Sequence, residues 1–478
     1  MMNLDFNLIK DLNSLQKRLF QENKPEFILA NESLNIVKGH PNYLEVFKNY
    51  SLKKFLSLFL KYSIINFYYL FSSLFFYKSK EINIKKNINF LVVSHFLSSN
   101  KTSHINNRDF YFDEFEKNMN FKKKNNFKIL INHSKKFRNG LYKKDKIILQ
   151  KYTSFRHSIY ILINLYFLFI KYFLTSFIKN KRESCLLKII SIEFLNPGTF
   201  KNLIIKKNLE DIIFGLNIKK VFFTFEGFPW ERFLCQIIKK NCENSKIFGY
   251  QFAILFKYQN SIFLNIPKIY LPNIILTSGI MNYKILKKKF FDISIIGSSR
   301  FSKNKKKNLN KKNCLILPEG MDSECEILSD FAIKCAYEIP HINFIIRFHP
   351  LTDLNKINEY LIKKINYKKL NNIKLSRKDL SYDLKRSSIC LHRGSTSAIT
   401  AMQSGVMPIY LNFHKNLNID PMFQISRKSR YIENVEDLKN FILKSPIDKL
   451  RILKKIKKSS KNYFTKFNHQ ELTKLVKE

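Results

Sequence analysis

Short apolar runs alternate with amphipathic stretches through most of this chain, and the alternation strongly constrains its fold. In the first half, runs of strand length lie at residues 90–96, 127–133, 186–195, 220–225 and 246–251. Residues 200–216 and 229–241 between them have the spacing of helices. Strands that alternate with helices form right-handed βαβ units, so the pattern predicts a parallel sheet.

A second series of the same kind begins near residue 290. Its strand-like runs lie at 313–317, 342–348, 373–375 and 389–392. Two series in tandem predict an α/β protein with two Rossmann-like, doubly wound domains that face each other across a cleft. The predicted parts are a helical region at 1–85, an N-terminal domain at 86–290, a C-terminal domain at 291–440 and a basic helix at 441–478.

Residues 389–411 read as a strand, a polar turn, a short helix and a second strand. The turn is Arg393, Gly394, Ser395, Thr396 and Ser397. We expect its hydroxyls to cap the helix, and its backbone N–H groups to hold a phosphate. Arg393 adds a guanidinium suited to bidentate phosphate contact. A capped helix in any α/β protein gives the same pattern, so the turn alone leaves both interpretations open.

Other polar residues follow strands of the second series. Glu319 and Gly320 follow one strand, and Arg347, His349 and Pro350 follow the next. The ends of parallel strands meet at one edge of a sheet, so we expect these residues beside the Ser-rich turn. The set suits a phosphate leaving group that needs charge compensation. His349 can act as an acid or as a phosphate-bound cation, or it is a turn residue before proline.

The equivalent edge of the first series carries Glu226, Trp230 and Glu231, and Gln251 ends the next strand. Glu226 can deprotonate an acceptor hydroxyl if its surroundings partly desolvate it. Binding an acceptor or capping a helix are alternative roles for it. Trp230 offers a flat apolar face for a sugar, Gln251 can bind sugar hydroxyls, and Glu231 can bind substrate or stabilise the start of a helix.

Two apolar segments, 52–77 and 158–178, interrupt the first half. A spanning helix needs about 20 apolar residues, and lysines interrupt both segments. We expect interfacial helices at a membrane surface. A membrane span and a helix buried in protein are the alternatives.

The net charge is +47 over 478 residues, and lysine supplies most of it. Lysine, asparagine, isoleucine and phenylalanine are abundant throughout, which indicates compositional drift more than a nucleic-acid surface. We expect no nucleic-acid partner, but attraction to an anionic membrane. Seven scattered cysteines without a CxxC pair indicate reduced thiols in the cytoplasm and no metal.

His349-Pro350 and Ser395-Thr396-Ser397, in this order, resemble motifs of bacterial surface-carbohydrate biosynthesis proteins of the GT-B type, akin to sialyl- and Kdo-transferases. Further similar segments are Glu226 to Glu231, 249–251, 298–301, 318–320 and 420–421. The resemblance covers about residues 88–425. It implies a C-terminal domain that binds a nucleotide-activated sugar, with a CMP-linked acidic sugar as one candidate. Related enzymes commonly have histidine where this chain has Phe252.

We therefore expect a glycosyltransferase on the inner face of the cytoplasmic membrane that extends a capsule, a lipopolysaccharide or another lipid-linked glycan. Glu226 is the expected base, and His349 with the Ser-rich turn holds the leaving phosphate. Glu319 and Gly320 lie near the nucleotide. No cofactor is expected beyond the nucleotide sugar. The alternatives are a CDP-polyol phosphotransferase and a non-catalytic GT-B-like scaffold.

Overall fold

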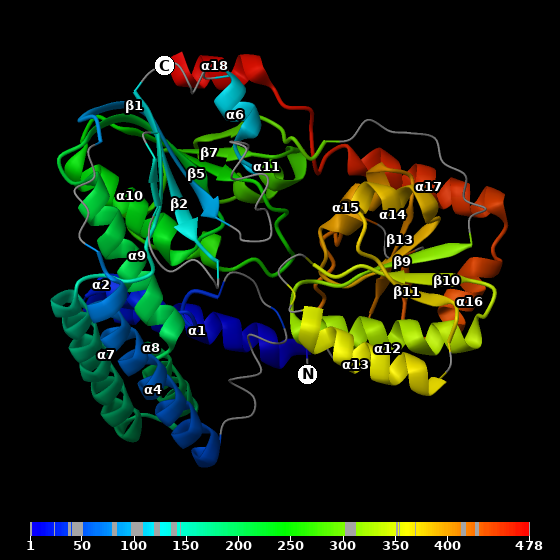
Figure 1. Ribbon diagram of the computed structural model, residues 1–478, viewed down its shortest axis with the longest axis horizontal. Helices are drawn as coiled ribbons and strands as arrows, with labels where there is room; N and C mark the ends of the chain where they lie inside the picture. Colours follow the sequence, from blue (N-terminus) through cyan, green and yellow to red (C-terminus); the bar gives the residue numbers. More distant parts are fainter. Residues whose placement is uncertain are drawn as a thin grey trace.

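The computed structural model describes residues 2–22, 24–36, 40, 51–78, 84–96, 109–118, 125–134, 141–143, 145–301, 312–349, 352, 354–368, 370–412, 417–425 and 430–477. These residues form two α/β units, each built on its own mainly parallel sheet (Figure 1). The predicted fold class, two Rossmann-like domains with helical additions in the N-terminal half, is confirmed.

The N-terminal sheet has the strand order β3-β4-β2-β1-β5-β6-β7-β8. All of its pairings are parallel except that of β3 with β4. Its strands are β1 Asn87–Phe96, β2 Asn126–Asn132, β3 Leu141–Lys143, β4 Lys146–Ile148, β5 Asn217–Thr224, β6 Lys246–Gln251, β7 Ile274–Thr277 and β8 Ile293–Ile295. From β1, the strands that follow in sequence are added on one side as β2 and on the other side as β5, so the strand order reverses between β1 and β5. Open α/β sheets bind their ligands at such a point.

Helices cover both faces of this sheet. They are α6 Asp113–Asn118, α9 Pro197–Ile213, α10 Pro229–Asn241 and α11 Ile280–Leu286, with short 3-10 turns at Ser261–Phe263 and Lys268–Tyr270. A further helix, α8 Lys181–Phe194, lies beside α7 Phe155–Thr175 in the layer below the sheet (Figure 1). The predicted strand at 186–195 is wrong, because this segment lies in α8. Ile189, Ile190 and Ile192 are all fully buried. A run that is apolar on every side has no period that separates a helix from a strand. Asn180 starts the helix by accepting a hydrogen bond from the Glu183 N–H.

The C-terminal sheet has the order β11-β10-β9-β12-β13-β14, and its strands pair in parallel throughout the described residues. Its strands are β9 Asn313–Leu317, β10 Asn343–Ile346, β11 Ile373–Leu375, β12 Ile389–His392, β13 Met407–Leu411 and β14 Tyr431–Ile432. The order reverses between β9 and β12. The helices are α12 Asp322–Glu338, α13 Leu354–Lys368, α14 Leu380–Arg386, α15 Ser397–Gln403 and α16 Val435–Leu443. Gly405 follows α15 with φ +81°, a conformation that favours glycine at the end of a helix.

The N-terminal residues and both apolar segments form a helical layer below the first sheet (Figure 1). It contains α1 Met2–Glu22, α2 Pro25–Ala30, α4 Leu52–Phe76 and α7 Phe155–Thr175, with a 3-10 turn at Ser176–Ile178. Leu19 of α1 and Phe27 of α2 belong to the same hydrophobic core as Leu91 of β1. The helical layer and the first sheet are therefore one packed unit.

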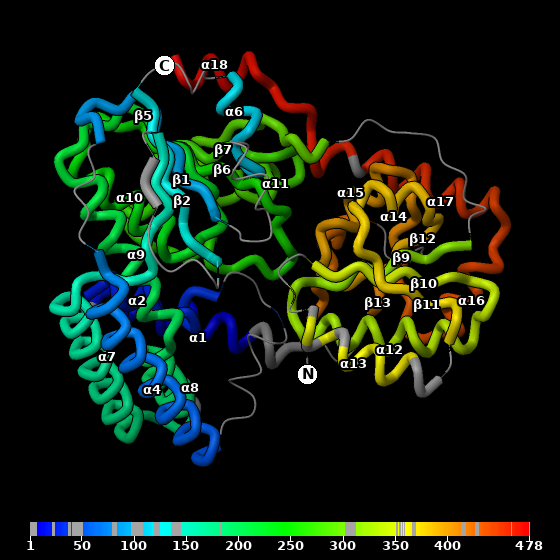
Figure 2. Tube along the Cα trace, in the orientation of Figure 1, coloured from blue at the N-terminus to red at the C-terminus, as the bar shows by residue number. Residues whose placement is uncertain are grey.

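The C-terminal tail forms two further helices instead of the single predicted helix. α17 Pro446–Ser460 lies with the C-terminal domain, and α18 His469–Lys477 lies against α6 of the N-terminal domain (Figure 2). Between them the chain pairs with the first domain, because the Met281 N–H donates to the Asn462 carbonyl and the Thr465 N–H donates to the Ser278 carbonyl. The tail therefore ties the two domains together.

Candidate functional site

The C-terminal domain brings Glu319 and Gly394 together where its strand order reverses. Glu319 follows β9 and Gly394 follows β12. A Cβ atom on Gly394 would lie 2.0 Å from Glu319 Oε2, and the φ of Gly394 is +68°. Only glycine combines this backbone conformation with so close an approach. The two predicted loops are therefore in direct contact.

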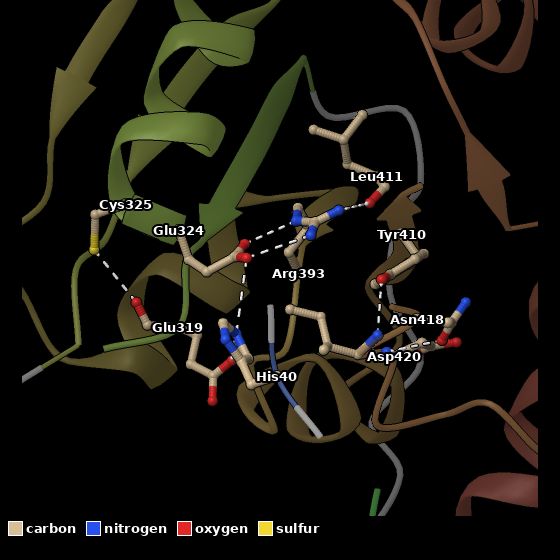
Figure 3. A network of polar contacts seen from close by, with 10 residues as sticks. His40, Glu319, Glu324, Cys325, Arg393, Tyr410, Leu411, Asn418 and Asp420 are labelled. Atoms are coloured by element: carbon tan, nitrogen blue, oxygen red, sulfur yellow. Dashed lines mark hydrogen bonds and ion pairs between the residues drawn. The ribbon is translucent and has the colours of Figure 1, made fainter. Parts of the chain in front are cut away.

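Arg393 lies inside the protein instead of at the surface of this site. Its Nε and Nη2 donate to the two carboxylate oxygens of Glu324 at 2.7 and 3.3 Å, and its Nη1 donates to the Leu411 carbonyl at 3.1 Å (Figure 3). The residue is fully buried. Burial lowers the pKa of Arg393, but the Glu324 carboxylate outweighs it and the net direction is up. The guanidinium is thus occupied in holding the turn, which corrects the predicted phosphate contact.

The Ser-rich turn itself is placed as predicted at the start of α15, but without the predicted hydroxyl cap. Thr396 occupies the N-cap position and makes no side-chain cap hydrogen bond. Its hydroxyl instead accepts a hydrogen bond from Arg300 Nη2 at 3.2 Å. Ser395 is buried, whereas Thr396 and Ser397 are partly exposed.

Gly320 and His349 are neighbours at the same edge. A Cβ atom on Gly320 would lie 3.0 Å from His349 Nδ1. Desolvation lowers the pKa of His349, and the Glu319 carboxylate acts in the opposite direction. Arg347 is a little further out and contacts Asp383 Oδ2 at 3.2 Å. Pro350 lies outside the described residues.

An N-terminal residue reaches this edge as well. His40 is fully buried, and its Nε2 lies 3.4 Å from Glu319 Oε2 and 3.8 Å from Glu324 Oε1 (Figure 3). Four residues earlier, the Ile36 carbonyl accepts hydrogen bonds from Ser261 and Asn260 of the N-terminal domain. Ile36 therefore contacts the N-terminal domain and His40 the C-terminal domain, and no sequence motif indicated either residue.

The N-terminal domain places a hydrogen-bonded chain where its own strand order reverses. His95 Nδ1 lies 2.8 Å from His133 Nε2, and His95 Nε2 lies 2.8 Å from Thr224 Oγ1. These residues end β1, follow β2 and end β5. These hydrogen bonds join the ends of β1, β2 and β5.

Glu231 organises the loop that carries Glu226. Its Oε2 accepts three backbone hydrogen bonds, from the N–H groups of Glu226, Gly227 and Phe228 at 2.8, 2.7 and 2.9 Å. Burial raises the pKa of the Glu231 carboxyl, and the three N–H donors oppose that shift. Glu231 is fully buried, so its carboxylate shapes the loop and leaves the partly exposed Glu226 as the side chain that a substrate can reach.

Trp230 and Gln251 lie deeper than predicted. Trp230 is 4% exposed and its ring meets the His95 ring edge-on at 5.4 Å, so it packs in the core and offers no open face to a sugar. Gln251 is 1% exposed and donates to the Ala253 carbonyl at 3.0 Å. Both predictions followed from position at a strand end, which fixes where a residue lies but leaves the direction of its side chain open.

Arg300 connects the two edges, and the sequence interpretation gave it no role. Its guanidinium lies 5.5 Å from the Phe252 ring, 4.4 Å from the Phe464 ring and at hydrogen-bond distance from Thr396. Glu226 and Tyr111 of the N-terminal domain interact with it electrostatically. The site therefore consists of the two strand edges with Arg300 between them.

No protein-family model and no curated protein matches the sequence. Similar solved structures include Anabaena Alr3699/HepE in complex with UDP and glucose, with 7% identity over 82% of this chain and 98% of that chain and a TM-score of 0.44. The glycotransferase of kitacinnamycin has 8% identity over 82% and 99% and a TM-score of 0.45. The GtfA/B complex has 13% identity over 58% and 60% and a TM-score of 0.39, so the match spans 60% of that chain.

Proposed function

We propose that this chain is a glycosyltransferase of the GT-B kind. The main support for the proposal is where the polar residues of the two domains lie. In both sheets they gather where the strand order reverses, which is where open α/β sheets bind their ligands. Arg300 and Thr396 join the two places. A donor in one domain and an acceptor in the other would meet at this junction.

The nucleotide-activated donor would bind at the ends of β9 and β12. The Glu319-Gly320 loop, His349 and the Ser395-to-Ser397 turn lie together there. Such a set offers backbone N–H groups, hydroxyls and an imidazole, which stabilise a developing phosphate charge without covalent chemistry. A CMP-linked acidic sugar is one donor to test.

The acceptor would bind at the ends of β1 and β5. Glu226 is the base in this proposal, because Glu231 fixes its loop and its own side chain is partly exposed. In transfer, the acceptor hydroxyl gives its proton to Glu226 and its oxygen attacks the sugar carbon. The bond from that carbon to the nucleotide phosphate breaks, and the phosphate takes the electron pair.

A membrane surface is the proposed location, with a lipid-linked or surface glycan as acceptor. Among the described residues, two helices are long and apolar enough to cross a membrane, Leu52–Phe76 and Phe155–Ile178. Their outward faces expose large side chains at helical spacing: Leu56, Leu60, Ile64, Phe71, Ile163, Phe167, Ile170 and Leu174. A patch of this kind marks an interaction surface, and the strongly basic chain suits anionic lipid.

The inner faces of these helices favour lying on a membrane over crossing it. Asn66 of α4 is fully buried and donates to the Leu195 carbonyl at 2.7 Å. Tyr62 donates to the buried Glu193 carboxylate at 3.2 Å, and Tyr166 of α7 donates to Ser63 at 2.7 Å. One face of the pair is therefore committed to polar contacts with protein. Only the other face is available to lipid, as in an interfacial helix.

Nucleotide binding tests the enzymatic proposal. We would titrate the purified chain with CMP, UDP, GDP and CDP and follow its melting temperature, beside His349→Ala and Ser395→Ala. One nucleotide should stabilise the wild-type protein, by about 2.7 kcal/mol at 100 times its dissociation constant, and both variants should weaken that response. A flat response from folded protein to all four would favour the scaffold. Transfer of a polyol phosphate from a CDP-polyol would select the phosphotransferase.

Vesicle binding tests the location. The wild-type chain should co-sediment with vesicles that contain anionic phosphatidylserine. The double variant Ile64→Ser/Ile163→Ser should bind at least about 10-fold more weakly, because two exposed apolar side chains are lost. Phe291→Ser is the matched control, since Phe291 is 97% exposed outside this patch. Equal binding of all three proteins would contradict the assignment of this surface.

A further inference from the structure

Arg300 lies where the chain leaves the N-terminal domain after β8. Its guanidinium is packed between two aromatic rings, Phe252 of the first domain at 5.5 Å and Phe464 of the C-terminal tail at 4.4 Å. Its Nη2 donates to the Thr396 hydroxyl of the second domain at 3.2 Å. Contacts from three parts of the chain therefore fix the direction of one guanidinium at the junction.

This guanidinium has no carboxylate partner among the described residues. Two buried arginines of the C-terminal domain do have one: Arg393 pairs with Glu324 at 2.7 Å, and Arg430 pairs with Asp420. A cation taken out of water without a counter-ion is costly. Desolvation lowers the pKa of Arg300 to about 10, and Tyr250, Tyr111 and Glu226 act in the opposite direction. The junction thus holds a positive charge that an anion would compensate.

A ligand can also reach Arg300. The residue is partly exposed. Arg232 gives the useful contrast, because it also lacks a carboxylate within ion-pair distance in the described structure. Arg232 is fully buried in the core and donates to the Ser261 carbonyl. A fully enclosed arginine of that kind supports the fold, whereas Arg300 combines an unpaired charge with access.

We propose that Arg300 binds a phosphate group of the ligand at the domain junction, with the Thr396 hydroxyl as a second donor. This inference rests on the proposed function, and it makes the Arg300 guanidinium the positive group that binds the phosphate of the donor nucleotide. The planar guanidinium can give two parallel N–H donors to phosphate oxygens. The Thr396 hydroxyl, which now accepts from Arg300, can turn its own O–H toward the same phosphate. The phosphate would then lie between the Glu226 loop and the Ser-rich turn.

Calorimetric titration with matched ligands tests this assignment. The ligands are CMP, UDP, GDP and CDP, their nucleosides, and inorganic pyrophosphate. Arg300→Gln should weaken the affinity for the nucleotide that binds the wild-type chain by about 10- to 100-fold. It should leave the affinity for the corresponding nucleoside unchanged. Arg300→Lys should recover only part of the loss, because it keeps the charge and loses the planar fork. Thr396→Val should cause a smaller loss.

Arg386→Gln is the matched control, since it removes one exposed arginine from the C-terminal domain and should bind as the wild type does. Near-ultraviolet circular dichroism establishes that each variant is folded. A nucleotide that binds wild type and Arg300→Gln equally would overturn the assignment and leave the glycosyltransferase standing. Pyrophosphate binding that depends on Arg300, without binding of any nucleotide, would support the phosphate site and contradict the transferase. No binding of any phosphate to the wild-type chain would overturn both.

Discussion

The two places where strand order reverses are built from different chemistry. In the N-terminal domain, the ends of β1 and β5 are joined by hydrogen bonds among His95, His133 and Thr224. In the C-terminal domain, the ends of β9 and β12 rest on a buried ion pair between Glu324 and Arg393, and His40 Nε2 lies 3.4 Å from Glu319 Oε2. One edge is joined by hydrogen bonds between side chains, and the other is held by an ion pair.

The difference shows that a charged residue at a strand end has two possible uses. Arg393 and Glu231 both lie at the positions predicted for ligand contact, yet each has its polar atoms engaged inside the protein. The residues left to meet a ligand include the partly exposed Glu226 and Arg300 and the exposed His349. The buried charges fix the loops, and the exposed ones are available for chemistry.

Breaking the charged edge should have the largest effect. Arg393→Met leaves the buried Glu324 carboxylate without its guanidinium and should lower the free energy of unfolding by about 3–5 kcal/mol. Urea unfolding of the full chain measures it. Lys439→Met is the control, because the pair of Lys439 with Glu338 lies at the surface, and it should leave the midpoint unchanged. Equal midpoints for both variants would mean that the C-terminal edge does not depend on its ion pair.

Acid should weaken the same domain through His392. Burial lowers the pKa of this histidine to about 4 from its ordinary 6.5. The unfolded chain therefore binds the proton more readily, and stability should fall as the pH drops from about 6.5 towards 4. The His392 contribution amounts to about 2 kcal/mol at pH 5. His392→Phe should show a shallower loss between pH 7 and pH 5 in urea midpoints. If the urea midpoints of the two proteins fall equally between pH 7 and pH 5, His392 is not the source of the acid sensitivity.

Glu231 and Glu226 provide a comparison within the N-terminal edge. Glu231→Ala removes the acceptor of three backbone N–H groups and should cost about 2 kcal/mol of stability. Glu226→Ala should cost little stability and should instead abolish transfer, if it is the base. Thermal unfolding and a transfer assay separate the two. A larger stability loss for Glu226→Ala would reverse the roles given to these carboxylates.

The hydrogen-bonded chain at the N-terminal edge should show the smallest effect. Thr224→Val removes the hydroxyl that lies 2.8 Å from His95 Nε2 and 3.4 Å from Glu231 Oε1, and its expected cost is about 1 kcal/mol. Urea unfolding at pH 7 measures it beside Arg393→Met. A loss as large as that of the ion-pair variant would remove the contrast between the two edges.

Most of the fold could be predicted from alternating runs, and the exceptions have a physical cause. The ranges of α10, β6, β9 and β12 agree with the predicted elements, because each has a clear period and a polar turn. Residues 186–195 were predicted as a strand but lie in α8, because a largely buried run has no hydrophobic period that distinguishes a helix from a strand. In the site, the turns were found correctly, but the direction of Trp230 and the partner of Arg393 depend on tertiary packing. The resemblance included Arg300 only within the segment 298–301 and gave it no role, because its partners lie in distant parts of the chain.

The most direct test of the central claim is hydrogen–deuterium exchange of the full chain with and without each of CMP, UDP, GDP and CDP. Our account predicts that one nucleotide slows exchange of the backbone amides at 319–321 and 394–398, on the two loops that meet where the C-terminal strand order reverses. Slower exchange confined to the 225–228 loop, or no change with any of the four, would contradict it.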